Sequence, residues 1–209
     1  MKGGKIIKHL FMEIYPKINF KYSWIYDQTW KDLFGKKNYP SPRVILSYTK
    51  KMENLWRREE KRILQELSRI THLNWQEESI NCYVVGKCKP FSDPLTLHIY
   101  ENMPDYFVDV LIHELIHNLF IQPGNEQKTR RAWQYFHRRY KNLPFNTRIH
   151  IPLHAIHSHI YYKLFNEKRL KRDIKLISFL PDYKKSWQVV QKDGYKKIIN
   201  EFTRRVGQS

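Results

Sequence analysis

Apolar residues recur at three- and four-residue spacing along most of the chain, and this periodicity predicts amphipathic helices. The longest such segment opens at Ser41-Pro42, which suits a helix N-cap and its first position. The predicted helices span residues 42–71, 126–140, 154–172 and 187–205, with a break near Gly194 in the last. A mainly helical protein is therefore expected.

Two short segments in mid-chain have a different pattern. Residues 80–85 and 95–100 are runs of β-branched and aromatic residues, separated by a loop that contains Gly86, Pro90 and Pro94. They predict two strands in a small antiparallel or mixed sheet. The fold class expected is thus α+β, with this sheet packed on a helix that follows it.

That following helix, residues 105–120, is apolar on nearly all sides, so we expect it to be buried in the core. We interpret residues 41–209 as one folded domain. Residues 1–40 are rich in aromatic and basic residues and end in a turn-rich break, which is typical of an arm packed on a core.

The buried helix carries the motif His113-Glu114-Leu115-Ile116-His117. Positions i and i+4 share one helix face, so His113 and His117 can bind one Zn²⁺ ion from the same side. Glu114 is carried beside the ion without having to bind it, which suits a general base that takes a proton from water. Buried polar groups on an apolar helix are costly unless something satisfies them, and a metal would do so.

A catalytic zinc site needs a third protein ligand, and the sequence offers several. We rank His154 first, because it shares a helical face with His157 and the small Ala155 beside it allows close helix approach. His157 comes second and His150 third, since His150 precedes Pro152 and is expected to lie ahead of the helix. The carboxylates of Glu126 and Glu167 are less favoured alternatives.

The region from about 80 to 170 resembles the minimal zincin metallopeptidases, in particular the small minigluzincins, on the basis of the HExxH helix and the strand before it. The resemblance implies that Leu95, Thr96, Leu97 and His98 form a sheet edge that binds an extended peptide substrate. Two features of these families are missing: no well-placed glutamate follows as a third ligand, and the metzincin extension after His117 is absent.

These observations predict a zinc-dependent metallopeptidase in which Glu114 acts as general base. A donor for the oxyanion of the transition state is also needed, and His157, His150 and Tyr161 are candidates. The alternative is a binding protein for nucleic acid or protein, in which the zinc is structural or lost.

The chain is strongly basic, with 38 Lys and Arg against 20 Asp and Glu and a formal net charge of +18. Such a charge attracts polyanions and favours a protease that works on protein bound to nucleic acid, like the SprT-like group. A basic surface that binds no partner is the competing interpretation. Two cysteines, no signal-type segment and no long apolar run predict a cytoplasmic protein without a membrane partner.

Overall fold

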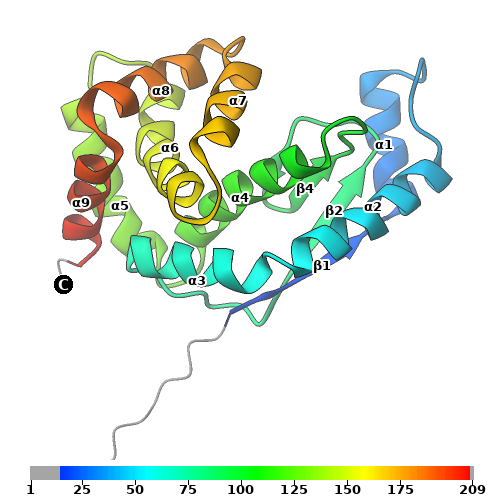
Figure 1. Ribbon diagram of the computed structural model, residues 1–209, viewed down its shortest axis with the longest axis horizontal. Helices are drawn as coiled ribbons and strands as arrows, with labels where there is room; N and C mark the ends of the chain where they lie inside the picture. Colours follow the sequence, from blue (N-terminus) through cyan, green and yellow to red (C-terminus); the bar gives the residue numbers. More distant parts are fainter. Residues whose placement is uncertain (1–14, 208–209) are drawn as a thin grey trace, which may run out of the picture.

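A four-stranded mixed sheet and a set of helices around it make up residues 15–207, the part of the chain that this computed structural model describes (Figure 1). The sheet order is β1 (Lys17–Lys21), β2 (Ser79–Val85), β4 (Leu95–His98) and β3 (Phe91–Ser92). The first three strands are parallel and β3 is antiparallel to β4. The predicted mainly helical α+β class is confirmed.

The helices fall into two groups along the chain. The first group accompanies the sheet and comprises α1 (Trp24–Phe34), α2 (Pro42–Arg57), α3 (Glu60–Thr71) and α4 (Pro104–Ile121). The second group comprises α5 (Glu126–Arg139), α6 (Phe145–Leu164), α7 (Glu167–Ile177), α8 (Pro181–Asp193) and α9 (Tyr195–Val206). In Figure 1, α4 runs from the sheet to this second group and so joins the two halves of the molecule.

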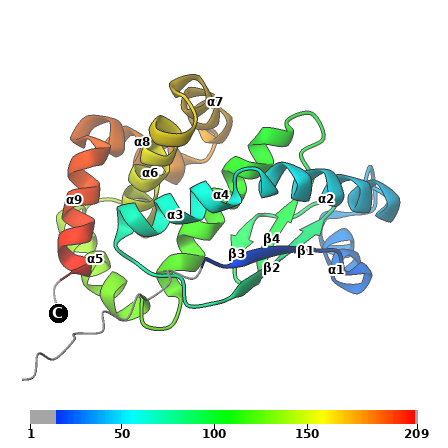
Figure 2. The same cartoon turned by 60° about the horizontal axis from the view of Figure 1, so that its bottom comes forward.

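The N-terminal segment contributes a strand to the sheet. β1 pairs with β2 in parallel register from Lys17–Ser79 to Lys21–Tyr83, and Ile18 is fully buried (Figure 2). Parallel neighbours need a crossover, and the segment that contains α1, α2 and α3 provides it. Of the predicted arm, residues 1–14 lie outside the described residues, and the part from Lys17 onward belongs to the same sheet and core as the rest.

The single helix expected over 42–71 is two helices, α2 and α3, separated at Arg58 and Glu59. The break lies where Glu60 makes contacts that a helical pattern cannot reveal. Its Oε1 accepts hydrogen bonds from the Ile18 backbone N–H at 2.9 Å and from the Trp56 indole N–H at 3.0 Å. The carboxylate at the start of α3 thereby ties the crossover to β1.

The helix predicted to open at Pro152 instead begins at Phe145, so Pro152 lies inside α6. An internal proline removes one helical hydrogen bond and normally costs about 3 kcal/mol. Burial offsets this cost, because α6 is packed against α3, α4, α5, α7, α8 and α9 and is buried along most of its length. The extension places His150 on the helix instead of ahead of it.

The helix predicted to run to residue 172 ends at Leu164, and α7 begins at Glu167, whereas most other expected elements are found close to their predicted positions. The helix predicted over 105–120 is α4, and its apolar residues are almost all buried. The break predicted near Gly194 separates α8 from α9. No helix within residues 15–207 is both long and apolar enough to cross a membrane.

Candidate metal centre

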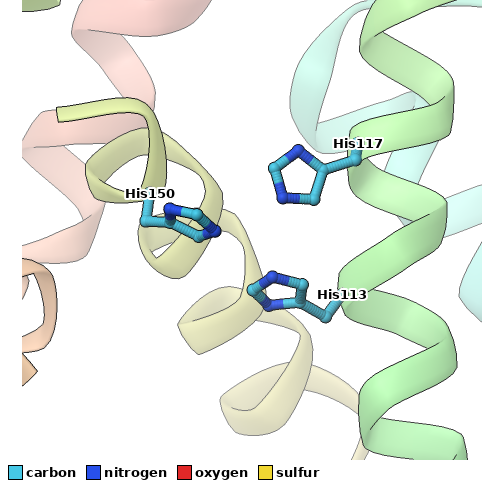
Figure 3. Close-up of side chains that lie close together, drawn as sticks. All are labelled: His113, His117 and His150. Atoms are coloured by element: carbon cyan, nitrogen blue, oxygen red, sulfur yellow. The ribbon is translucent and has the colours of Figure 1, made fainter. Parts of the chain in front are cut away.

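The histidines of the HExxH motif lie on the buried α4, one turn apart. Their ring centroids are 5.2 Å apart, and His113 is only 8% exposed. The i, i+4 spacing places both rings on the helix face that meets α6. Figure 3 shows the two rings projecting from α4 into the space between the two helices.

His150 reaches the same space from α6 (Figure 3). One ring nitrogen each from His113, His117 and His150 lie within 4.8 Å of one another, and within residues 15–207 this is the one group of this kind that could hold a metal ion. The His150 Nδ1–H donates to the backbone carbonyl oxygen of Asn146 at 2.7 Å. This hydrogen bond orients the ring and leaves Nε2 free to bind a metal.

The chemistry of the three rings fits a metal ion. Nε2 of His113 and Nε2 of His150 are buried and have no hydrogen-bond partner in the part of the chain that the structure describes. Burial lowers the pKa of His113 well below its usual value and that of His117 to about 3, and burial also lowers the pKa of His150. The rings are therefore neutral, which is the state in which imidazole binds zinc, copper, iron or nickel.

His154, ranked first as third ligand, lies outside this group. It is fully buried one turn further along α6, its Nδ1 is 2.9 Å from the Ser186 hydroxyl, and its ring stacks on Trp187 with centroids 4.2 Å apart. The geometry therefore favours His150 over His154 as the third candidate ligand. The prediction ranked His150 last because it placed His150 before the helix on account of Pro152, whereas α6 begins at Phe145.

His157, the second alternative, lines the wall of a cavity next to the site. It is 2% exposed, neither of its ring nitrogens has a partner among the described residues, and it stacks on Tyr161 with centroids 4.6 Å apart. Tyr161 itself is fully buried behind it. Glu126 and Glu167 lie at the starts of α5 and α7 and are not part of the metal-binding group.

Glu114 lies on the wall of the same cavity, next to His113. It is 6% exposed, and burial raises the pKa of its carboxyl to about 8, while the charge of Lys89 acts in the opposite direction. A cation held by the adjacent histidines would favour the ionised carboxylate. A buried carboxyl group thus lies in the same cavity wall as a histidine of the candidate metal-binding group.

The cavity has a volume of about 630 Å³, which is enough for an amino-acid side chain together with part of a peptide backbone. It runs between α4, the loop after β2, and the α7–α8 region. Its wall combines apolar and polar side chains from these elements, among them Lys89, Pro90, His98, Tyr106, Asp109, Val110, Asp173, Leu176, Phe179 and Tyr183.

The predicted substrate strand differs from expectation in one respect. Leu95, Thr96 and Leu97 are buried, and His98 lines the cavity. However, β3 pairs with Leu95 and Thr96, so β3 and not β4 is the sheet edge at that point. β3 has only two residues, which is too short to produce a recognisable strand pattern in the sequence.

Two residues of the site were not found from the sequence. The ring of Tyr183 lies against His150 and His113, with centroid distances of 4.3 and 5.6 Å, and Asp173 lies in the cavity wall. Neither belongs to a motif, and both come from helices far along the chain from the HExxH segment. Only the packing of α7 and α8 beside α4 and α6 brings them to the site.

Comparisons of the chain with models of protein families, with curated proteins and with solved structures find no match. The class that the fold and site define is therefore a mainly helical α+β protein with a buried group of three histidines that could hold a metal ion.

Proposed function

We propose that this protein is a zinc-dependent metallopeptidase. The observation that carries the proposal is the convergence of His113, His117 and His150 beside Glu114, at the wall of a cavity large enough for a peptide. Catalytic zinc is commonly bound by three imidazoles, with water in the fourth coordination position. A structural zinc site, in contrast, usually has four protein ligands.

When bound by these three rings, zinc would supply Lewis acidity toward a scissile carbonyl and make water a better nucleophile at neutral pH. Glu114 accepts the proton of the attacking water and then donates it to the leaving amine. Its burial against the cavity wall keeps the carboxyl away from bulk water and close to the reacting groups. The Asn146 carbonyl holds the His150 ring in the orientation that binding requires.

The oxyanion that forms during attack needs a hydrogen-bond donor. Tyr183 is the best placed candidate, because its ring lies over the histidines and it lines the cavity. Burial raises the pKa of its hydroxyl, which keeps the proton available for donation. His157 is a second candidate from deeper in the same cavity.

An extended peptide would bind by adding a strand to the sheet. The sheet edge next to β4 is β3, since β3 pairs with Leu95 and Thr96 of β4. Lys89 and Pro90, directly before β3, line the cavity together with Glu114. A peptide paired with β3 would thus lead toward the metal centre.

Glu114→Gln tests the proposal. We expect the variant to bind zinc like the parent and to lose about 10²–10⁴-fold in peptide cleavage, because the amide cannot accept the proton. Zinc content is measured by elemental analysis and cleavage with labelled casein, with and without a chelator. Glu126→Gln, an exposed glutamate away from the histidines, is the matched control and should cleave normally. Undiminished cleavage by Glu114→Gln would show that the base is assigned wrongly.

A second candidate follows from the net charge of +18, which favours a protease or binding protein that acts on nucleic acid or on protein bound to it. Phosphate contacts weaken steeply as salt increases. A gel-shift titration with duplex DNA should therefore show binding at low salt that falls as salt is raised. Absence of any shift at low salt would eliminate this candidate and leave the peptidase proposal unchanged.

A further inference from the structure

A buried acid, Asp173 of α7, lies in the wall of the cavity beside the metal centre and has no countercharge of its own. It is 4% exposed, and in the described part of the chain no ion pair involves it. The hydroxyl of Tyr161, a neutral group, is its polar neighbour on α6. Burying a carboxylate without a cationic partner costs free energy. A cationic ligand bound in the cavity would offset this cost.

The nearby arginines are already engaged. Arg169 Nε and Arg172 Nη2 each lie 2.7 Å from one carboxylate oxygen of the fully buried Asp109. Arg172 also pairs with Asp105. Asp105 and Asp109 thus take up both guanidinium groups, and Asp173 forms no ion pair with either arginine.

Part of the wall of the cavity that holds both His113 and Asp173 is apolar. Val110, Leu176, Ile177 and Leu180 belong to it. Asp109, whose charge acts on Asp173, lies four residues before His113 on α4, so this acidic part of the cavity wall is about 6 Å along the helix from His113. A buried carboxyl group in a partly apolar cavity wall matches a side chain with an aliphatic stem and a cationic head.

We propose that this cavity is a specificity pocket for a lysine or arginine side chain next to the scissile bond, with Asp173 as the group that receives the cation. The inference rests on the proposed peptidase function and names its substrate class. A purely apolar side chain would fill the cavity but leave Asp173 unpaired in a pocket from which water has been expelled. Burial raises the pKa of Asp173 to about 7, in keeping with a carboxyl that lacks a nearby unshared cation.

The test uses a random peptide library that contains norleucine, a neutral residue with the apolar stem of lysine. Cleavage products of the parent, Asp173→Asn and Glu167→Gln are identified by mass spectrometry. We expect the parent to cleave next to lysine or arginine at least about tenfold more often than next to norleucine, and Asp173→Asn to lose this preference while still cleaving next to norleucine. Glu167→Gln removes an exposed acid from the same helix and should keep the preference.

A binding measurement separates this inference from the peptidase proposal. Calorimetry with Nα-acetyl-lysine amide and Nα-acetyl-norleucine amide is carried out on the Glu114→Gln protein with and without Asp173→Asn, after thermal melts confirm folding. Selective lysine binding that Asp173→Asn removes supports the pocket even if no peptide is cleaved. Cleavage without a preference for basic residues, or an equal loss for all peptides in Asp173→Asn, would overturn the pocket and leave the peptidase proposal standing.

Discussion

His150 and His154 lie one turn apart on α6, and both are buried with an Nε2 that has no partner within residues 15–207, yet they have different neighbours. His150 faces the two histidines of α4, whereas His154 is held against Ser186 and Trp187 of α8. Residue type and helical spacing are the same for both. Only the direction from which α4 and α8 approach the helix distinguishes a candidate ligand from a packed core histidine.

This difference gives a matched pair of substitutions. Asparagine can retain a polar group near the Nδ1 position of histidine but lacks Nε2, so His150→Asn should lose zinc while His154→Asn should keep it. We expect His150→Asn to weaken zinc binding more than about 100-fold. Replacing a residue that only hydrogen-bonds to a metal ligand costs at most about 100-fold, so a larger loss identifies His150 as a ligand. Zinc affinity is measured by competition with a chromophoric chelator.

The reverse result would contradict the geometry. If His154→Asn loses zinc and His150→Asn retains it, the ranking based on the sequence would be right and the three-histidine group would not be the site. Circular dichroism of both variants shows whether either change unfolds α6.

At the level of elements, α7 is attached to α4 by a buried charge cluster. Asp109 is fully buried and accepts one hydrogen bond each from Arg169 and Arg172, and Arg169 also donates to the Asp105 backbone carbonyl at 2.8 Å. Removing one partner of a buried pair leaves an uncompensated charge. This cluster fixes one wall of the cavity relative to the HExxH helix.

Asp109→Asn should therefore lower the free energy of unfolding by about 3–5 kcal/mol at pH 8, where the carboxylate is ionised. The pH matters because burial raises the pKa of Asp109 to about 6. Glu201→Gln, which removes a surface partner of Arg204 and Arg205 on α9, should cost less than about 1 kcal/mol. Urea denaturation measures the free energy of unfolding of both variants. Equal losses would mean that the buried charge cluster stabilises the fold no more than a surface ion pair does.

The pattern of elements was largely predictable, and the exceptions share one cause. α4, α5 and the break between α8 and α9 follow from local periodicity and from Gly194. The break between α2 and α3 depends on Glu60 binding to β1, and the early start of α6 depends on helices that pack around it. In each exception a contact distant in sequence outweighed the local signal.

For the whole molecule, two buried acids should give opposite pH dependences of stability. Burial raises the pKa of Asp173 from its ordinary 3.8 to about 7, with the charge of Asp109 acting in the same direction and Tyr161, Arg172 and Arg169 acting against it. Its contribution to stability is fully present below pH 4 and is lost as the pH rises through about 7. Asp173→Asn should therefore gain stability relative to the parent between pH 4 and pH 7.

Glu66 behaves in the opposite way. The hydrogen bond from Arg69 is the largest influence on it, and with His159 it lowers the pKa of Glu66 from 4.5 to about 2 in spite of burial. The stability it contributes is present above pH 4.5 and is lost as the pH falls through about 2. Glu66→Gln should be less stable than the parent at neutral pH and approach it near pH 2, as measured by urea midpoints across this range. If the stability of either variant changes with pH in parallel with that of the parent, the shifted pKa of that acid is contradicted.

The sequence by itself determined the helical character, the mid-chain strands, the buried helix and the three motif residues His113, Glu114 and His117, because these depend on periodicity and on fixed spacing along one helix. Tertiary structure alone decided that His150 joins the two motif histidines, that β3 forms the sheet edge, and that Tyr183 and Asp173 border the site. The physical reason is that these residues come from separate elements. Their meeting depends on how α4, α6, α7 and α8 pack together, which no local pattern encodes.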